Sequence, residues 1–318
     1  MFLSPYIKFL CLSVFDPHTE EAWRLYGLNS YFIIASSFIL IVVIALLIYT
    51  SIKFRAKPGD IEPKQIGGNK IVEAFMIGIP FLMVAFFFYL TVDIMHDIQP
   101  AVKKGNPLVV ITGHQWWWQV SYPGSPVVTA NEIHLPAGKK ILLQLEANDV
   151  IHSWWVPAFG PKMDMLPGAT NYLWVTIKNP GIYEGVCSEF CGKQHAWMRI
   201  RIIAHKPDDY EQWLKQKSEK AMIPAEQGAI KGAAIFNKES CSGCHSIRGT
   251  VAAGKTGPDL THIASRNTLL AGAIQNNRES LRRFLSNPQK VKPGAHMPRF
   301  IYKKDTINAL VEYLSALK

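Results

Sequence analysis

Two long apolar runs near the beginning of the chain constrain its fold more than any other feature. Residues 31–51 hold no charged side chain, and residues 71–95 hold only Glu73 near the start and Asp93 near the end. A helix rises about 1.5 Å per residue, so about 20 apolar residues cross a hydrocarbon core about 30 Å thick. Both runs are too long and too uniformly apolar for two helices of a soluble core. The sequence therefore predicts a two-helix transmembrane hairpin over residues 31–95.

The segment between the two runs is strongly basic. It sets Asp60 and Glu62 against five cations, which are Lys53, Arg55, Lys57, Lys64 and Lys70. Short loops this rich in lysine and arginine stay on the cytoplasmic side of a membrane. Both ends of the hairpin then face outward. We expect the residues after Met95 to lie on the periplasmic or outer side of a bacterial inner (plasma) membrane.

The first 15 residues are apolar but interrupted by Pro5. A cleaved signal peptide is the alternative, but no small-x-small cleavage site follows this run. We therefore expect residues 1–30 to form an outer segment that begins in the membrane interface. Cys11 within it has no ligand-spaced neighbour and is expected to be an inert apolar residue.

Short apolar runs replace the long ones after the hairpin. They predict β-strands at residues 108–112, 141–145, 172–177 and 198–203. Gly and Pro punctuate these runs, which is typical of a β-sandwich or barrel. The chain has 318 residues, enough for about two domains. We place the β domain at residues 96–206, a helix and linker at 207–225, and a last module at 226–318.

One segment of the β domain carries an unusual set of soft ligands. Cys187, Cys191, His195 and Met198 are spaced four, four and three residues apart. Thiolates, imidazole and a weak thioether together suit copper. Two thiolates over-supply one copper, whereas two coppers that share both sulfurs use the whole segment and need a second histidine, for which His152 is the best candidate. A disulfide is the alternative in an oxidising compartment, but it leaves His195 and Met198 without a reason for their spacing.

The last module contains a second candidate redox site. Cys241-Ser-Gly-Cys-His245 is the attachment pattern of c-type haem, in which Cys241 and Cys244 bond the haem and His245 meets the iron. A redox disulfide or half of a zinc site is the alternative. A zinc site needs two further ligands at similar spacing, and residues 226–318 contain no other cysteine.

The sixth iron ligand is expected downstream of this motif. Met297 is the candidate, because methionine opposite histidine raises the reduction potential. His296, one residue earlier, is its rival, and His262 is a weaker one. Three residues at helical spacing near the chain end are interpreted as core packed on the haem edge (Leu310, Tyr313 and Leu314).

The pattern Cys-Ser-Glu-x-Cys-Gly-x-x-His-x-x-Met, with the upstream His-Ser, resembles the dinuclear copper (CuA) site of cytochrome c oxidase subunit II. The resemblance implies a cupredoxin fold for the β domain and adds the backbone carbonyl of Glu189 to the copper ligands. It also implies that the Glu189 carboxylate reaches a magnesium ion shared with subunit I, and that Asp164 approaches this magnesium and the haem propionates. Ala169 stands where the family commonly has arginine after Pro-Gly, so an arginine contact is not expected there.

The resemblance implies roles for two more residues. Trp116, the first tryptophan after His-Gln, lies where electrons enter from cytochrome c, whereas Trp117 and Trp118 are expected to be core residues. Glu73, seven residues before Pro80, marks the entrance of a proton-uptake channel into subunit I. A solvated acid at a helix end is the alternative interpretation of Glu73, although ionisable groups at membrane depth are functional candidates. Three histidines without ligand spacing are expected to be surface or core residues (His114, His134 and His205).

Residues 226–318 resemble a class I, all-α cytochrome c, and the whole chain resembles a caa-type subunit II, in which this domain follows the copper domain. The resemblance implies an electron path from a cytochrome c or a membrane electron-donor complex to haem c, then to the two copper ions, then to haem a of subunit I. Subunit I reduces oxygen and pumps protons. Subunits I and III and the lipid bilayer are the implied partners. The net charge is +10, but no nucleic-acid motif is present and no nucleic acid is expected.

Three other functions are compatible with parts of the sequence. A quinol oxidase subunit II shares the hairpin and the sandwich but lacks the copper ligands. A copper-delivery protein has no use for covalent haem. A structural assembly subunit with vestigial sites contains neither copper nor haem iron, so metal analysis separates it from the electron-transfer interpretation.

Overall fold

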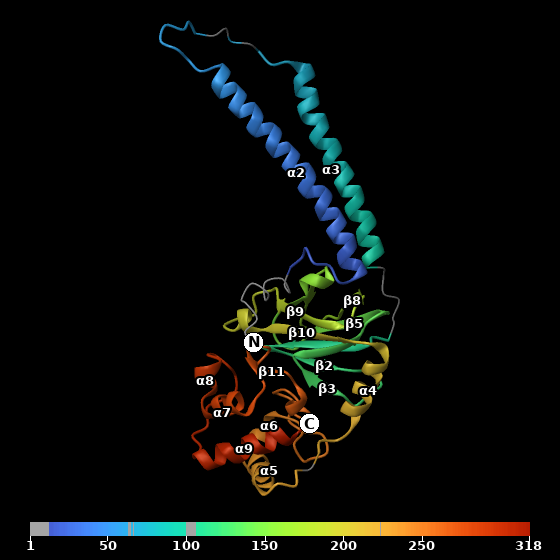
Figure 1. Ribbon diagram of the computed structural model, residues 1–318, viewed down its shortest axis with the longest axis vertical. Helices are drawn as coiled ribbons and strands as arrows, with labels where there is room; N and C mark the ends of the chain where they lie inside the picture. Colours follow the sequence, from blue (N-terminus) through green and yellow to red (C-terminus); the bar gives the residue numbers. More distant parts are fainter. Residues whose placement is uncertain (1–12, 63–64, 66, 100–105, 223) are drawn as a thin grey trace. The chain divides into compact units, whose positions relative to one another are not determined.

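The computed structural model describes residues 13–62, 65, 67–99, 106–222 and 224–318. They belong to two compact units, one within Trp23–Pro100 and one that holds the remainder (Figure 1). The expectations for residues 1–12, including Cys11, and for Lys64 lie outside the described residues.

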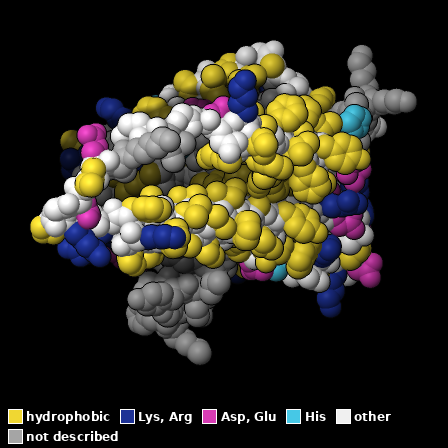
Figure 2. Space-filling model, turned by 90° about the horizontal axis from the view of Figure 1, so that it is seen from above, with side chains coloured by type: hydrophobic (Ala, Val, Ile, Leu, Met, Phe, Trp, Pro, Cys, Tyr) yellow, Lys and Arg dark blue, Asp and Glu magenta, His cyan; other side chains and the backbone are white. Residues whose placement is uncertain are grey.

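The membrane hairpin consists of helices α2 (Glu20–Lys53) and α3 (Lys70–Ile98), both long and apolar enough to span a membrane. They run side by side, and the ring centroids of Phe32 and Phe87 lie 5.6 Å apart (Figure 1). Hydrophobic side chains of both helices are exposed, as expected for surfaces that face lipid (Figure 2). Pro80 lies inside α3, which spanning helices tolerate.

Both helices begin at capping residues. The hydroxyl of Thr19 accepts the N–H of Ala22 (3.0 Å), so α2 starts well before the predicted residue 31. A polar first turn capped in this way continues a helix beyond its apolar run. The side chain of Asn69 accepts the N–H of Ile71 (3.0 Å) at the start of α3. Glu73 lies in the first turn of α3, as an exposed acid at a helix end.

The β domain is a sandwich of two five-stranded sheets. One sheet has the order β3 (Val128–Ala130), β2 (Trp117–Ser121), β1 (Val109–His114), β5 (Lys140–Ala147) and β8 (Asn171–Thr176), and the other has the order β4 (Glu132–Pro136), β10 (Arg199–His205), β9 (Gly181–Cys187), β6 (His152–Trp155) and β7 (Met163–Met165). The four predicted strands correspond to β1, β5, β8 and β10 within one residue at each start. Trp117 and Trp118 are buried in the core as predicted.

The last module is helical apart from the short hairpin β11 (Thr268–Leu269) and β12 (Ile274–Gln275). Its helices are α5 (Gln227–Lys238), α6 (Cys241–Cys244), α7 (Arg278–Ser286), α8 (Pro288–Val291) and α9 (Lys304–Ala316), and α4 (Pro207–Ser218) precedes it. Helix α5 crosses α9 over a core that contains Phe236. Leu310, Tyr313 and Leu314 are buried in this core, as predicted.

The crossing of α5 and α9 depends on a glycine. A Cβ atom at Gly232 would lie 2.0 Å from the backbone oxygen of Ala309. We expect Gly232→Ala to destabilise the module by about 1–3 kcal/mol, because the helices must separate to admit the methyl group. Thermal unfolding followed by the haem absorbance measures this loss.

Gly228 on the same helix is the matched control. A Cβ there would meet only the carboxylate of Glu312, whose side chain can move away. Gly228→Ala should therefore be neutral or stabilise by up to about 1 kcal/mol through helix propensity. Equal destabilisation by both variants would show that the helix crossing does not depend on close contact at Gly232.

Candidate metal centre

The copper-ligand candidates are held by two strands and the loop between β9 and β10. His152 is the first residue of β6 and Cys187 is the last residue of β9, and these strands pair with Trp154 opposite Cys187. The loop that follows Cys187 carries Cys191 and His195 and ends at Met198, directly before β10. The rigid sheet thus fixes two of the candidates, and a short loop brings the others back to them.

The structure brings all six predicted ligand atoms together. The Sγ atoms of Cys187 and Cys191 lie 3.8 Å apart, and both cysteines are free and buried. The Nδ1 atom of His152 lies 3.9 Å from Cys187 Sγ, and that of His195 lies 3.7 Å from Cys191 Sγ. The Met198 sulfur lies 3.8 Å from Cys191 Sγ. The Glu189 carbonyl oxygen lies 3.3 Å from Cys187 Sγ.

This arrangement has two similar halves. Each half offers one sulfur, one imidazole Nδ1 and one weak donor, which is Glu189 oxygen beside Cys187 and Met198 sulfur beside Cys191. These six residues would therefore suit two copper ions, since soft sulfur and imidazole donors with weak additional donors favour copper. The disulfide alternative is not the state of the structure, because both thiols are free.

The contact between the two thiols moves their pKa values in opposite directions. The hydrogen bond between Cys187 and Cys191 is the largest cause that lowers the pKa of Cys187, and it raises the pKa of Cys191. Burial lowers the pKa of His152, but its hydrogen bonds to Cys187 and Asp149 outweigh burial and raise it. Metal ligands must be deprotonated, so copper binding releases the remaining thiol proton and is favoured as pH rises.

Asp149 orients His152 and was not anticipated from the sequence. Its Oδ1 atom lies 2.8 Å from Nε2 of His152, and its carboxylate also accepts the N–H groups of Gln115 (2.6 Å) and Val150 (2.7 Å). A proton held on Nε2 by this carboxylate leaves Nδ1 free for a metal. A carboxylate three residues before a candidate histidine ligand was the available signal.

We expect Asp149→Ala to weaken copper binding by roughly 10–100-fold, the usual cost of losing an outer partner of a ligand histidine. Competition with a chelator measures the affinity, and Glu211→Ala is the control because that carboxyl group is exposed on α4, outside the strands and loop that hold the ligands. Unchanged affinity in Asp149→Ala would mean that the strand alone orients His152.

Trp116 is hydrogen-bonded to the copper-ligand loop. Its indole Nε1 donates to the carbonyl oxygen of Cys191 (3.0 Å), and the side chain of Gln115 donates to the same oxygen (2.7 Å). Gly192 has a φ of +116°, and a Cβ there would lie 3.0 Å from the Trp116 ring. Glycine is thus needed for both the backbone conformation and the close approach of the indole.

The other acids predicted for this site lie at its periphery. Asp164 on β7 is exposed, and its backbone oxygen accepts the side-chain N–H of Asn171 (2.7 Å). The carboxyl group of Glu189 is exposed, and Phe190 beside it is 76 % exposed. Glu73 belongs to the other unit of the chain.

Of the three histidines without ligand spacing, His134 and His205 stack with ring nitrogens 2.7 Å apart, and His114 stacks on Trp117.

The predicted haem-attachment motif lies on the short helix α6 and the residue after it. Cys241 and Cys244 are free on α6, and the next residue, His245, donates from Nδ1 to the carbonyl of Pro258 (2.8 Å). This bond leaves Nε2 for the iron. Burial lowers the pKa of His245, which favours the neutral ligand form. A Cβ at Gly257 would lie 2.6 Å from the His245 ring, so glycine is required under the imidazole.

The two alternative candidates for the sixth iron ligand, His296 and His262, make other contacts. The ring of His296 lies 4.8 Å from that of Trp116. His262 contacts the carbonyl oxygens of Lys318 (2.8 Å) and Glu219 (3.1 Å). Both observations favour Met297 as the sixth ligand, although its role stays a prediction.

A membrane hairpin, a cupredoxin sandwich with paired sulfur and imidazole ligands, and a c-type cytochrome module together define a membrane-anchored electron-transfer protein. Two family models match this division: "Cytochrome C oxidase subunit II, periplasmic domain" over residues 125–205 and "Cytochrome c" over residues 229–318.

Similar proteins extend the match to nearly the whole chain. Cytochrome c oxidase subunit 2 of Alkalihalophilus pseudofirmus is 35% identical over 96% of this chain and 91% of its own length. The Bacillus subtilis protein of the same name is 30% identical over 96% and 92%. The periplasmic domain of subunit II from Bradyrhizobium japonicum is 32% identical over 37% of this chain and 96% of its own, with a TM-score of 0.35. The chain belongs to the cytochrome c oxidase subunit II family and is a subunit of a haem-copper oxidase.

Proposed function

We propose that this chain relays single electrons from an external donor to subunit I of a terminal oxidase. The route leads from haem c at Cys241, Cys244 and His245 to the dinuclear copper centre, and from there to haem a of subunit I. Subunit I reduces oxygen and couples this reaction to proton pumping. When bound, the haem iron and the copper pair each supply a one-electron couple.

The observation that supports this proposal most strongly is a line of contacts between the two candidate redox sites. The Trp116 indole donates to the carbonyl oxygen of Cys191 (3.0 Å). The His296 ring lies 4.8 Å from the Trp116 ring, and His296 directly precedes Met297. Trp116 therefore contacts both the ligand loop of one site and the ligand segment of the other.

The protein contributes rigidity and exclusion of water at the copper site. Cys187, Cys191 and Met198 are at most 3 % exposed, and His152 is fully buried. The position of His152 and Cys187 on paired strands limits ligand movement when the charge of the site changes. When the ligands move little, the reorganisation energy of each electron transfer stays low.

We assign three acids to the interface with the oxidase core. The exposed carboxyl groups of Glu189 and Asp164, with the exposed ring of Phe190, form a surface suited to subunit I. Glu189 would hold a magnesium ion shared with that subunit, and Asp164 would approach the ion and the haem propionates. Glu73 would mark the entrance of the proton-uptake channel, and Glu73→Gln should slow proton uptake without changing haem c reduction.

The proposed setting is a bacterial inner membrane. Subunits I and III and the lipid bilayer would surround the hairpin, and the donor would be a cytochrome c or a membrane electron-donor complex. The two helices that can span a membrane and the basic segment between them support this setting.

Rapid-mixing spectroscopy of the purified complex with a pulse of reductant tests the relay. The expected order of reduction is haem c first, copper second and haem a third. His152→Asn should block the second step while haem c remains reducible. Reduction of copper before haem c would contradict the proposed route, and material without copper or haem iron would favour a purely structural subunit.

A further inference from the structure

The cytochrome module covers the tryptophan at the copper site. The ammonium group of Lys292 donates to the backbone oxygen of Trp116 (3.1 Å), and the His296 ring lies against the indole. The side chain of Gln194, in the copper-ligand loop, donates to the carbonyl oxygens of Lys292 (3.2 Å) and Pro293 (2.7 Å). Trp116 is only 7 % exposed and Lys292 only 5 %.

A second contact fixes the module from a different direction. Glu132 on β4 of the sandwich is 1 % exposed. Its carboxylate accepts the backbone N–H groups of Asn267 (2.9 Å) and Thr268 (2.8 Å) and the hydroxyl of Thr268 (2.9 Å). These donors all belong to the cytochrome module. Hydrogen bonds to a buried charge are stronger than neutral ones, and without the module Glu132 would lose all of these donors.

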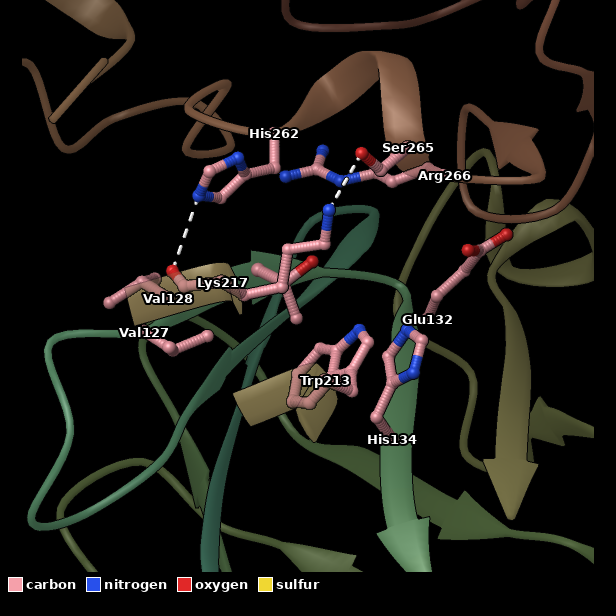
Figure 3. Close-up of a pocket in the computed structure, with 10 residues that line it drawn as sticks. Val127, Val128, Glu132, His134, Trp213, Lys217, His262, Ser265 and Arg266 are labelled. Carbon is pink, nitrogen blue, oxygen red and sulfur yellow. Dashed lines mark hydrogen bonds between the residues drawn. The ribbon is translucent and has the colours of Figure 1, made fainter. Parts of the chain in front are cut away.

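A third set of contacts lies beside Glu132. Figure 3 shows Trp213 and Lys217 of α4 opposite His262 and Ser265 of the module, with the Lys217 ammonium donating to the Ser265 hydroxyl (2.8 Å). The cavity that they line has a volume of about 20 Å³, room for about one water molecule. The guanidinium of Arg248 also donates to the backbone oxygen of Pro126. Together with the Glu132 contacts, these hydrogen bonds favour one defined orientation of the module.

We propose that Glu132 latches the cytochrome module onto the copper domain in one orientation, in which the His296 ring is held against Trp116. This inference rests on the proposed relay, and it names Glu132 as the residue that positions the module for it. A reduced one-electron donor protein, such as a haem protein, would give up one electron to a haem held by Cys241, Cys244 and His245. That electron would pass on to copper held by the loop around Cys191, and no proton or bond would be exchanged.

Hydrogen–deuterium exchange on the full-length, metal-loaded protein in detergent tests the latch. In the wild type, the N–H groups of Asn267 and Thr268 should be protected, together with the segment around Trp116. Glu132→Ala should accelerate exchange at both places by at least about tenfold, because opening of the module then becomes frequent. Glu211→Gln is the matched control, since it removes one acidic charge from the exposed face of α4 and should change neither.

A kinetic readout accompanies the exchange measurement. The rate of electron transfer from haem c to copper should be independent of ionic strength in the wild type, because no docking step precedes it. In Glu132→Ala this rate should fall and become dependent on salt, since docking of the freed module is then governed by screened charges.

The result that overturns the latch is rapid exchange of Asn267 and Thr268 in the wild type, or exchange unaffected by Glu132→Ala. If Glu132→Ala also loosens β9 and β10, Lys292→Met decides: faster exchange around Trp116 alone supports this orientation, and unchanged exchange there refutes it. Absence of copper or haem iron would refute the relay but not the latch, because the latch consists of contacts between protein groups only.

Discussion

Replacement of Cys191 by serine is expected to abolish the dinuclear copper centre while haem c remains attached and reducible. The Cys191 sulfur is the most connected atom of the site, at 3.8 Å from the Cys187 sulfur, 3.7 Å from His195 Nδ1 and 3.8 Å from the Met198 sulfur. With one sulfur left, two coppers cannot share two bridges. Copper should fall from two ions to at most one per chain, and the mixed-valence spectrum should disappear.

The loss of electron transfer should be correspondingly large. Removal of an outer partner of a metal ligand costs roughly 10–100-fold, and removal of a bridging ligand should exceed that range. Transfer from haem c to subunit I in Cys191→Ser should therefore be at least about 100-fold slower. Rapid-mixing spectroscopy measures this rate, and elemental analysis measures the copper.

Met198→Leu is the control for Cys191→Ser. The thioether is a weak donor, and weak axial ligands tune the reduction potential of copper rather than hold the metal. This variant should retain two coppers with a shifted potential. A Cys191→Ser protein with two coppers and an unchanged mixed-valence spectrum would exclude bridging by this sulfur.

Local patterns predicted most of the fold and the copper-ligand candidates that the structure brings together. Ligand spacing in a single loop pointed to Cys187, Cys191, His195 and Met198. His152 was added because two coppers need a second histidine, and the uncharged runs located the hairpin. The start of α2 was misplaced because the cap at Thr19 acts beyond the apolar run.

Contacts between distant segments could not be predicted in the same way. Glu132 and Thr268 are separated by 136 positions and belong to different domains. The sequence around either residue therefore does not predict their contact. The stack of His134 and His205 has the same origin, since parallel pairing of β4 with β10 brings them together. Asp149 was overlooked for another reason: its bond to His152 depends on the path of the loop between β5 and β6.

The identity of the sixth haem ligand is tested by two neighbouring substitutions. Met297→Leu should remove the methionine sulfur from the iron and lower the potential of haem c, because methionine opposite histidine raises it. Axial ligands set haem potentials over a range of about 0.8 V, and we expect a fall on the order of 0.1 V. At 59 mV per tenfold for one electron, this shift disfavours reduction of haem c by more than about tenfold.

His296→Gln separates ligation from contact with the copper domain. The His296 ring lies against Trp116, while Gln289 holds the segment by donating to the carbonyl oxygens of Ala295 (2.7 Å) and Met297 (3.3 Å). This variant should therefore keep the potential and low-spin spectrum of haem c and slow only its electron transfer to copper. Redox titration and absorption spectra of the two variants decide between the residues. A lowered haem c potential in His296→Gln, with a normal potential in Met297→Leu, would show that His296 is the iron ligand. It would also mean that the His296 ring does not lie against Trp116 in the haem-loaded protein.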